Sequence, residues 1–196
     1  MVLRGFVSSV VDEAALLEEL AQVTEAAPFR HLVTPGGFRM SVAMTNCGAL
    51  GWISDLDGYR YEAVDPDSGR AWPALPPTFR RLATEAATRG GFPDFVPDAC
   101  LVNQYQPGAR LTLHQDRNER DDAAPIVSVS LGLPAIFLFG GSTRRERPAR
   151  IPVHHGDVVV WGGPSRMRYH GIAPLSDGLH ARLGARRINF TFRTAA

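Results

Sequence analysis

Lysine is absent from this 196-residue sequence, so all 21 basic residues are arginines. The planar guanidinium group of arginine suits phosphate and carboxylate groups. A GC-rich genome also favours arginine over lysine, so the absence of lysine alone indicates no particular function. Cysteine is also scarce. Cys47 and Cys100 lack a Cys-x-x-Cys spacing, which excludes a disulfide framework and disfavours a zinc finger.

Long apolar runs are missing as well. No stretch approaches the roughly 20 residues that span a bilayer, and residues 1–11 lack the apolar core and cleavage site of a signal peptide. We therefore expect a cytoplasmic protein that does not contact a membrane.

Charge is unevenly distributed, although the net charge is only +1. Residues 1–143 carry 11 arginines against 17 acidic residues, whereas residues 144–196 carry 10 arginines against 3 acidic residues. The length corresponds to one domain at roughly 100 to 200 residues per domain, and 44% hydrophobic with 21% charged residues is typical of a globular protein. We predict a single domain over 1–196, with helices and a lid in 1–98 and a β core in 99–196.

Two amphipathic helices are expected in the first half. Asp12 can cap a helix that ends before Pro28, and a second helix begins near Pro77 and ends at Gly90. Between them, residues 35–76 are rich in turn-forming residues, so short strands or hairpins are expected. The segment also carries the aromatic residues Trp52, Tyr59, Tyr61 and Trp72. A segment of this length that carries several aromatic side chains is typical of a lid or binding loop.

The second half changes to period-two alternation and short apolar runs. The expected strands are 101–105, 110–113, 126–133, 135–139, 157–161 and 186–193. The first two flank Gln106–Ala109, which has Pro and Gly in the central positions of a type II turn. Short strands separated by turns predict a mainly β fold with flanking helices, as a sandwich, jelly roll or small barrel.

One His-x-Asp pair offers metal chemistry. His114 and Asp116 lie at the end of a predicted strand, where period two places both side chains on one face. His170 follows another predicted strand end and a Gly-Gly turn, a position from which it can supply the third ligand. Two histidines and a carboxylate with open positions form the facial triad of non-haem iron(II) oxygenases. The alternative is a chance motif in which His114 makes a surface hydrogen bond.

The C-terminal strand separates apolar from polar residues. Ile188, Phe190 and Phe192 share one face, and the other face carries Arg187, Asn189, Thr191 and Arg193. Inside a jelly roll the polar face lines a cavity, where the arginines need a carboxylate partner because an uncompensated buried charge is costly. A dicarboxylate such as 2-oxoglutarate suits that cavity. The alternative is that the polar face contacts water.

From about Phe29 to the end, the sequence resembles the AlkB-type iron(II)- and 2-oxoglutarate-dependent dioxygenases, which repair alkylated nucleobases. The resemblance is carried by residues 34–48, 103–116, 128–132, 155–163, 169–171 and 187–193. It implies a double-stranded β-helix (jelly roll) core with an N-terminal nucleotide-recognition lid. It also implies a monomer that uses Fe(II), 2-oxoglutarate and O2.

The resemblance assigns roles to individual residues. Its implied iron ligands are His114, Asp116 and His170. Its implied 2-oxoglutarate contacts are Asn103, Tyr105, Arg187, Asn189, Thr191 and Arg193, with Trp161 lining the same pocket. Its implied substrate contacts are Trp52, Tyr59, Tyr61, Asn118 and Arg144.

The activity implied is oxidative demethylation of 1-methyladenine and 3-methylcytosine in single- or double-stranded DNA, with formaldehyde release. Two alternatives stay open: a dioxygenase of the same fold acting on RNA or tRNA, because base stacking ignores the 2′-hydroxyl, and a nucleic-acid-binding jelly roll without catalysis. One departure concerns specificity. The best-known member has Lys-Asp-Glu after the metal aspartate, whereas this sequence has Arg117-Asn118-Glu119. Asn118 can both accept and donate hydrogen bonds.

Overall fold

The helices of the protein cover one side of a large sheet. A computed structural model describes residues Met1–Ala196. Its helices are α1 (Val7–Val10), α2 (Glu13–Ala26), α3 (Pro77–Arg89) and the 3-10 helix η1 (Gly163–Ser165). The Asp12 carboxylate accepts a hydrogen bond from the Ala14 amide, and α3 ends at Gly90, so both predicted helices are confirmed. None of the helices is long and apolar enough to cross a bilayer.

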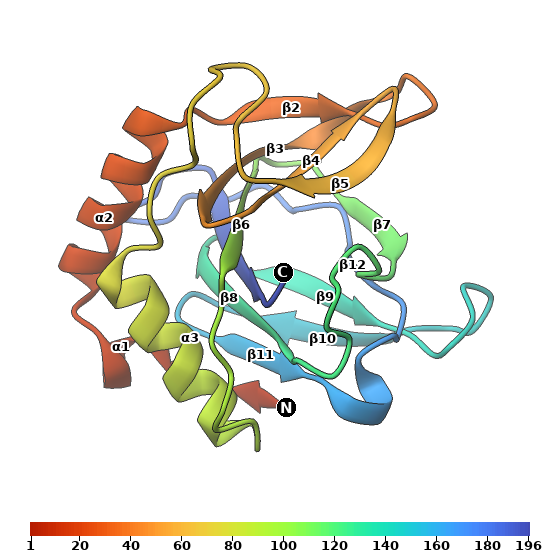
Figure 1. The fold of residues 1–196 in the computed structure, drawn as a ribbon. Helices are drawn as coiled ribbons and strands as arrows, with labels where there is room; N and C mark the ends of the chain where they lie inside the picture. The colour runs from red at the N-terminus through yellow and green to blue at the C-terminus, as the bar shows by residue number, and fades with distance from the viewer.

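Two antiparallel sheets build the body of the molecule (Figure 1). In spatial order, the seven-stranded sheet comprises β1 (Val2–Leu3), β11 (Val158–Trp161), β8 (Ile126–Gly132), β13 (Arg187–Arg193), β6 (Ala99–Tyr105), β3 (Arg39–Gly48) and β2 (Arg30–Val33). The four-stranded sheet comprises β10 (Ala149–Val153), β9 (Ala135–Phe139), β12 (His170–Ile172) and β7 (Leu111–His114). The prediction of a mainly β fold with flanking helices is confirmed.

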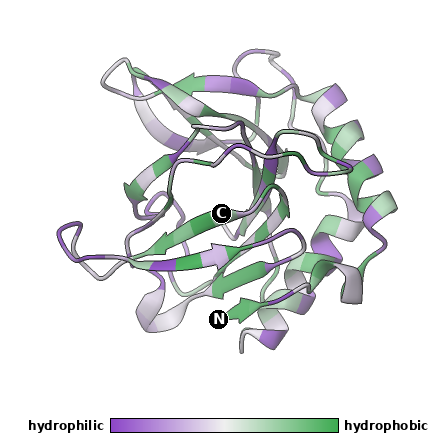
Figure 2. Ribbon diagram, turned by 180° about the vertical axis from the view of Figure 1, so that it is seen from behind, coloured by the Kyte–Doolittle hydropathy of each residue, from purple (hydrophilic) through white to green (hydrophobic).

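Two hydrophobic cores lie on opposite faces of the large sheet. The apolar face of β13, with Phe190 and Phe192, packs against Phe79 of α3. The second core lies between the two sheets and includes Ile126 and Phe137. In Figure 2 the central strands are mostly green, whereas the helices carry both hydrophobic and hydrophilic segments. The β13 polar face therefore points into the space between the sheets and not to water.

Strands from the first half also belong to the large sheet. β3 is ten residues long and pairs with β6 in register, Cys47 opposite Cys100. The expectation of only short strands over 35–76 is thus wrong for β3. The buried centre of β3, Val42–Cys47, mixes apolar with small and polar residues, so it gives no clear strand signal in the sequence. The sequence patterns also did not predict β1, α1, β2, β10 and β12, which are short or partly exposed.

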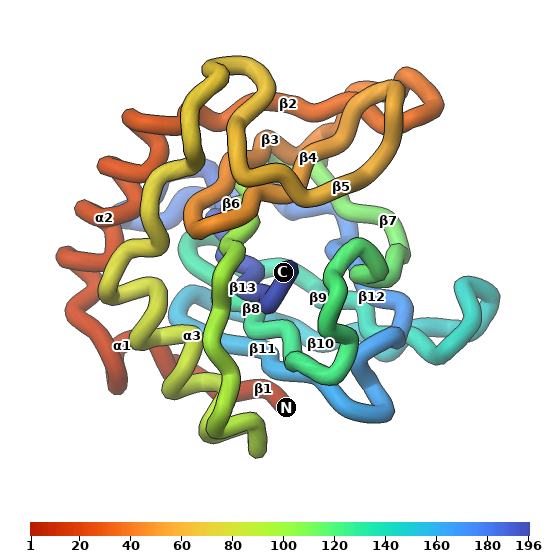
Figure 3. The backbone as a smooth tube through the Cα atoms, in the orientation of Figure 1, coloured from red at the N-terminus to blue at the C-terminus, as the bar shows by residue number.

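A separate hairpin forms the lid over the space between the sheets. β4 (Gly51–Asp55) pairs with β5 (Gly58–Glu62), and Trp52 lies directly opposite Tyr61. The smooth trace in Figure 3 shows this hairpin at the end of the molecule where β3 and β7 also lie. The hairpin carries the aromatic side chains that the sequence assigned to a lid.

Two glycines shape the strands that hold the site. Gly108 has a φ of +83°, and the Ala109 amide donates to the Gln106 carbonyl at 2.9 Å, which confirms the predicted turn. Gly171 lies in β12, where a Cβ would stand 2.5 Å from the Leu111 carbonyl oxygen. Only glycine lets β12 approach β7 this closely, and that approach brings His170 next to His114.

Candidate active site

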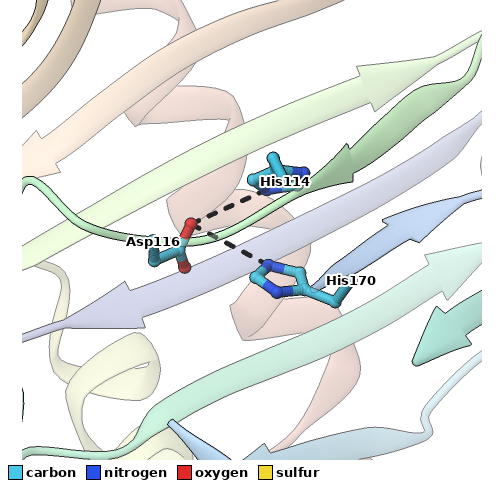
Figure 4. A group of neighbouring side chains, drawn as sticks. All are labelled: His114, Asp116 and His170. Carbon is cyan, nitrogen blue, oxygen red and sulfur yellow. Dashed lines mark ion pairs between the residues drawn. The ribbon is translucent and has the colours of Figure 1, made fainter. Parts of the chain in front are cut away.

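The three predicted metal ligands converge on one point between β7 and β12. His114 ends β7, Asp116 follows two residues later, and His170 begins β12 directly opposite His114. Asp116 Oδ1 lies 3.6 Å from His114 Nε2 and 3.8 Å from His170 Nε2 (Figure 4). One ligand atom from each residue lies within 4.8 Å of the others. Strand pairing thus brings His170 to His114 and Asp116, which lie more than fifty residues earlier in the chain.

Hydrogen bonds fix the orientation of both imidazoles. His114 Nδ1 donates to the Thr112 carbonyl at 2.9 Å, and His170 Nδ1 donates to the Arg168 carbonyl at 3.1 Å. Because a carbonyl only accepts, each Nδ1 carries the proton and each Nε2 keeps its lone pair. Burial lowers the pKa of His170 to about 4, and His114 adds to this effect. His170 is therefore neutral, as a metal ligand must be.

Asp116 divides its two oxygens between different partners. Oδ1 faces the histidines, while Oδ2 accepts from Arg193 Nε at 3.0 Å and from Nη2 at 2.9 Å. Burial raises the pKa of the Asp116 carboxyl, but the positive charge of Arg193 outweighs it, and the pKa lies well below its usual range. The residue is thus an ionised carboxylate with one oxygen directed at the ligand cluster.

A cavity of about 700 Å³ opens beside the triad. It is lined by all three triad residues and by nine other residues from the sequence prediction, namely Asn103, Tyr105, Asn189, Thr191, Arg193, Trp52, Tyr59, Asn118 and Arg144. Trp161 also lines it, as expected. Arg187 and Tyr61 lie outside this lining. The structure therefore brings both candidate cofactor contacts and candidate substrate contacts to one space.

The two arginines of β13 have different surroundings. Arg193 is paired with Asp116, and its Nε also lies 3.2 Å from Glu119 Oε1. Arg187 is 1% exposed and has no carboxylate partner; its Nη2 donates to Ser130 Oγ at 2.9 Å, while Nε and Nη1 have no partner. Its guanidinium lies 4.9 Å from the centre of the Tyr105 ring, which lines the cavity. Burial lowers the pKa of Arg187.

The amides and the hydroxyl of the polar face bond mainly to one another. Asn189 Oδ1 accepts from Asn103 Nδ2 at 3.2 Å and from Thr191 Oγ1 at 3.1 Å, and Asn189 Nδ2 donates to Ser128 Oγ at 2.9 Å. Asn103 Oδ1 and the indole nitrogen of Trp161 are buried without partners. The side-chain amide of Asn189 therefore has all its hydrogen-bond partners within the protein, whereas Asn103 and Trp161 each keep one polar atom without a partner.

The lid aromatics form one stacked pair at the cavity. The rings of Trp52 and Tyr59 lie 5.6 Å apart at an angle of 15°. Asn118 bridges them, since its Oδ1 accepts from Trp52 Nε1 at 3.5 Å and its Nδ2 donates to the Tyr59 carbonyl at 3.3 Å. Tyr59 is 45% exposed, so a flat apolar face stands at the cavity mouth.

Tyr61 does not line the cavity, although Glu119, the partner of its hydroxyl, does. Its hydroxyl donates to Glu119 Oε1 at 2.6 Å, in a buried cluster with Arg166 and Arg193. Sequence analysis missed Glu119 and Arg166, because charged residues in a loop are usually solvated. The one available signal was the position of Glu119, three residues after the metal aspartate.

Arg144 lies at the rim of the cavity, where the sequence prediction placed a substrate contact. Its Nε and Nη2 donate to the Leu113 carbonyl at 3.1 and 2.6 Å, next to His114. The side chain is exposed and passes over the Tyr169 ring. It is thus anchored beside the triad with its remaining donors directed to solvent.

The residues present fit an iron(II) ion and 2-oxoglutarate. The Nε2 atoms of His114 and His170 and Oδ1 of Asp116 converge, and none of these three atoms has a polar partner closer than 3.6 Å. This donor set is the facial triad of non-haem iron oxygenases. A buried arginine with two unpartnered nitrogens fits a carboxylate group. Fold and site together define the class of iron(II)- and 2-oxoglutarate-dependent oxygenases.

Comparison with known proteins agrees with this class. The sequence profile of the 2OG-Fe(II) oxygenase superfamily matches residues 1–193. The chain is 53% identical to the alpha-ketoglutarate-dependent dioxygenase AlkB of Escherichia coli (strain K12), over 100% of this chain and 89% of that protein. It is 56% identical to the AlkB dioxygenase of Salmonella typhimurium (strain LT2), over 93% of this chain and 84% of that protein. The solved structure of OsALKBH1 superposes with a TM-score of 0.81 at 25% identity, covering 98% of this chain and 96% of that chain.

The chain belongs to the 2OG-Fe(II) oxygenase superfamily and, within it, to the AlkB dioxygenases. The predicted jelly-roll fold, the cofactors Fe(II), 2-oxoglutarate and O2, and the assignment as a dioxygenase are thereby confirmed. The alternative of a jelly roll without catalysis is not favoured.

Proposed function

We propose that the protein repairs DNA by oxidative demethylation of N-alkylated bases, with 1-methyladenine and 3-methylcytosine as its main substrates. The observation that supports this most directly is the convergence of the ligand triad and the stacked pair of Trp52 and Tyr59 on one cavity. The AlkB relatives, which match over nearly the whole chain, support the same activity.

Each part of the site then has a task. Bound iron and 2-oxoglutarate supply, with O2, the oxidation that turns the N-methyl group into a hydroxymethyl group while 2-oxoglutarate becomes succinate and CO2. His114 and His170 would hold the ion through Nε2, and Asp116 would hold it through Oδ1. Arg187 would bind the distal carboxylate through the nitrogens that have no partner in the protein. The hydroxymethyl group leaves the base as formaldehyde.

The lid recognises the base and not the sequence around it. A base must leave the helical stack before it can enter a closed cavity, and an aromatic face then receives it with about 1 to 3 kcal/mol of stacking energy. Tyr59 offers such a face, and Arg144 lies at the rim, where a phosphate of the flipped nucleotide would pass. We also infer a cytoplasmic monomer that accepts single- or double-stranded DNA.

Formaldehyde release tests the proposal. The protein is incubated with Fe(II), 2-oxoglutarate and oligonucleotides of one sequence carrying 1-methyladenine, 3-methylcytosine or no methyl group, as DNA and as RNA. We expect formaldehyde from the methylated DNA and none from the unmethylated strand. Faster release from RNA would favour the RNA alternative, and no release from any strand would refute the proposal. His114→Ala should be inactive, whereas the matched control His31→Ala, at an exposed position outside the cavity, should be fully active.

A further inference from the structure

A buried carboxylate, Glu119, joins three separate parts of the fold. Its side chain is 2% exposed. Oε1 accepts from the Tyr61 hydroxyl of β5 at 2.6 Å and lies 3.2 Å from Nε of Arg193 in β13, while Oε2 accepts from Arg166 Nη2 at 3.1 Å. Glu119 also lines the active-site cavity, whereas Arg166 does not, and the proposed chemistry assigns a role to neither residue.

Both arginines that contact Glu119 also contact Asp116. Arg193 donates to Asp116 Oδ2 from Nε and Nη2, at 3.0 and 2.9 Å. Arg166 Nη1 donates to the main-chain carbonyl of the same aspartate at 3.0 Å, and its side chain is 2% exposed. The two arginines thus hold the carboxylate and the backbone of the central metal ligand, and Glu119 pairs with both of them.

The other end of this cluster is the hairpin that carries the stacking surface. Tyr61 lies directly opposite Trp52 in the β4–β5 pair, so strand pairing links the positions of the two residues. Burial raises the pKa of the Tyr61 hydroxyl well above its ordinary value, so it keeps its proton and donates to Glu119. A displacement of Trp52 therefore reaches a buried group of two positive and two negative charges, where the low dielectric makes each contact sensitive to the others.

We propose that Glu119 is a positioning residue that couples the β4–β5 hairpin to Asp116, so that a base on the hairpin and a metal ion in the triad favour one another's binding. The inference rests on the proposed function for the identity of the base. The hairpin sets the position of Tyr61, Tyr61 sets how Glu119 is shared between Arg166 and Arg193, and Arg193 orients the Asp116 carboxylate.

Such coupling is reciprocal and can be measured without turnover. We would determine the Kd of a 1-methyladenine oligonucleotide for the protein without metal, and for the protein with Mn(II) and 2-oxoglutarate under anaerobic conditions. The ratio of the two Kd values is the coupling factor, which we expect to be at least about 5 in the wild type, at the lower end of typical values. Tyr61→Phe removes one hydroxyl and should reduce this factor to below about 2. The Mn(II) electron paramagnetic resonance spectrum should change on oligonucleotide binding in the wild type and stay unchanged in Tyr61→Phe.

Ser54→Ala is the matched control. Ser54 is a buried residue of β4 whose hydroxyl donates to the Val33 carbonyl at 2.6 Å, so it anchors the same hairpin without touching Glu119. Its loss should weaken oligonucleotide binding equally with and without metal, which leaves the coupling factor unchanged. Glu119→Gln should reduce the factor as Tyr61→Phe does, and the double variant should reduce it no further, because both changes interrupt one chain of contacts.

Two results would overturn the proposal. One is a coupling factor near 1 in the wild type, and the other is an unchanged factor in Tyr61→Phe, which would leave the Glu119 cluster a purely structural role. If Glu119→Gln fails to fold, Tyr61→Phe alone decides the question. Formaldehyde release by the wild type tests the proposed function separately, so a failure of coupling and a failure of demethylation are distinguishable.

Discussion

Replacing Arg187 with methionine should have opposite effects on 2-oxoglutarate binding and on stability. Methionine keeps much of the apolar volume of the arginine stem but removes the buried guanidinium, which lies 4.9 Å from the centre of the Tyr105 ring and has two unpartnered nitrogens. Charge-assisted hydrogen bonds contribute about 1.5 to 3 kcal/mol each, so losing a bidentate pair to a carboxylate costs about 3 kcal/mol or more. At 1.4 kcal/mol per factor of ten, Arg187→Met should raise the Kd for 2-oxoglutarate about 100-fold.

Without 2-oxoglutarate the same variant should be more stable than the wild type. A buried donor without a partner costs about 1 to 3 kcal/mol, and Tm changes by about 2 to 4 °C per kcal/mol at this size, so Tm should rise by several degrees. Arg193→Met is the control, because it leaves Asp116 and Glu119 without a shared partner and should lower stability by about 3 kcal/mol. Calorimetric titration and thermal unfolding measure both quantities. An unchanged Kd together with an unchanged Tm would refute this account of Arg187.

Three further predictions concern the triad, the base and the phosphate contacts. His114→Ala and His170→Ala should fold but bind no Co(II) by absorption spectroscopy, whereas Asp116→Ala should also lose about 3 kcal/mol of stability, because it leaves Arg193 without that buried carboxylate. Asn118→Asp should increase discrimination against 1-methylguanine and 3-methylthymine, because a carboxylate only accepts hydrogen bonds, as measured by ratios of kcat/KM. Arg144→Ala should weaken DNA binding and reduce the slope of log Kd against log salt concentration by about 1.

Each of these predictions has a result that would contradict it. Co(II) binding by His170→Ala would remove that residue from the metal site. An identical kcat/KM ratio in the wild type and Asn118→Asp would mean that Asn118 only bridges Trp52 and Tyr59 and does not contact the base edge. An unchanged salt slope for Arg144→Ala would mean that its donors serve the Leu113 carbonyl alone.

Local patterns predicted the helices with an apolar stripe and the strands with a clear alternation or a short apolar run, and they failed for strands that lack both signals. Apolar periodicity, short apolar runs and turn residues predicted the two long helices and the strands β6, β8, β9, β11 and β13. β3 does not, because its centre, Val42–Cys47, mixes apolar with small and polar residues and lies in a segment rich in turn-forming residues. β12 is three residues long, and its pairing with β7 depends on a contact across more than fifty residues.

The site shows the same division between local pattern and tertiary contact. The spacing of His114 and Asp116 and the alternation of β13 are local, and both pointed to residues that line one cavity. The difference between Arg187 and Arg193 depends on which acids surround each arginine in space, and no spacing reveals it. Tyr61 resembles a substrate contact in sequence, yet its hydroxyl donates to Glu119 inside the protein; its role at the substrate stays a prediction.

The most direct test of the central claim is the mass of a single methylated oligonucleotide before and after reaction. With Fe(II), 2-oxoglutarate and O2 present, a strand carrying one 1-methyladenine should lose the mass of one CH2 group, with one formaldehyde and at least one succinate formed per strand. Omitting any of the three should leave the mass unchanged, as should His170→Ala. Succinate formation with the methyl group still on the strand would contradict the account, because it would show an active oxygenase whose substrate is not the alkylated base.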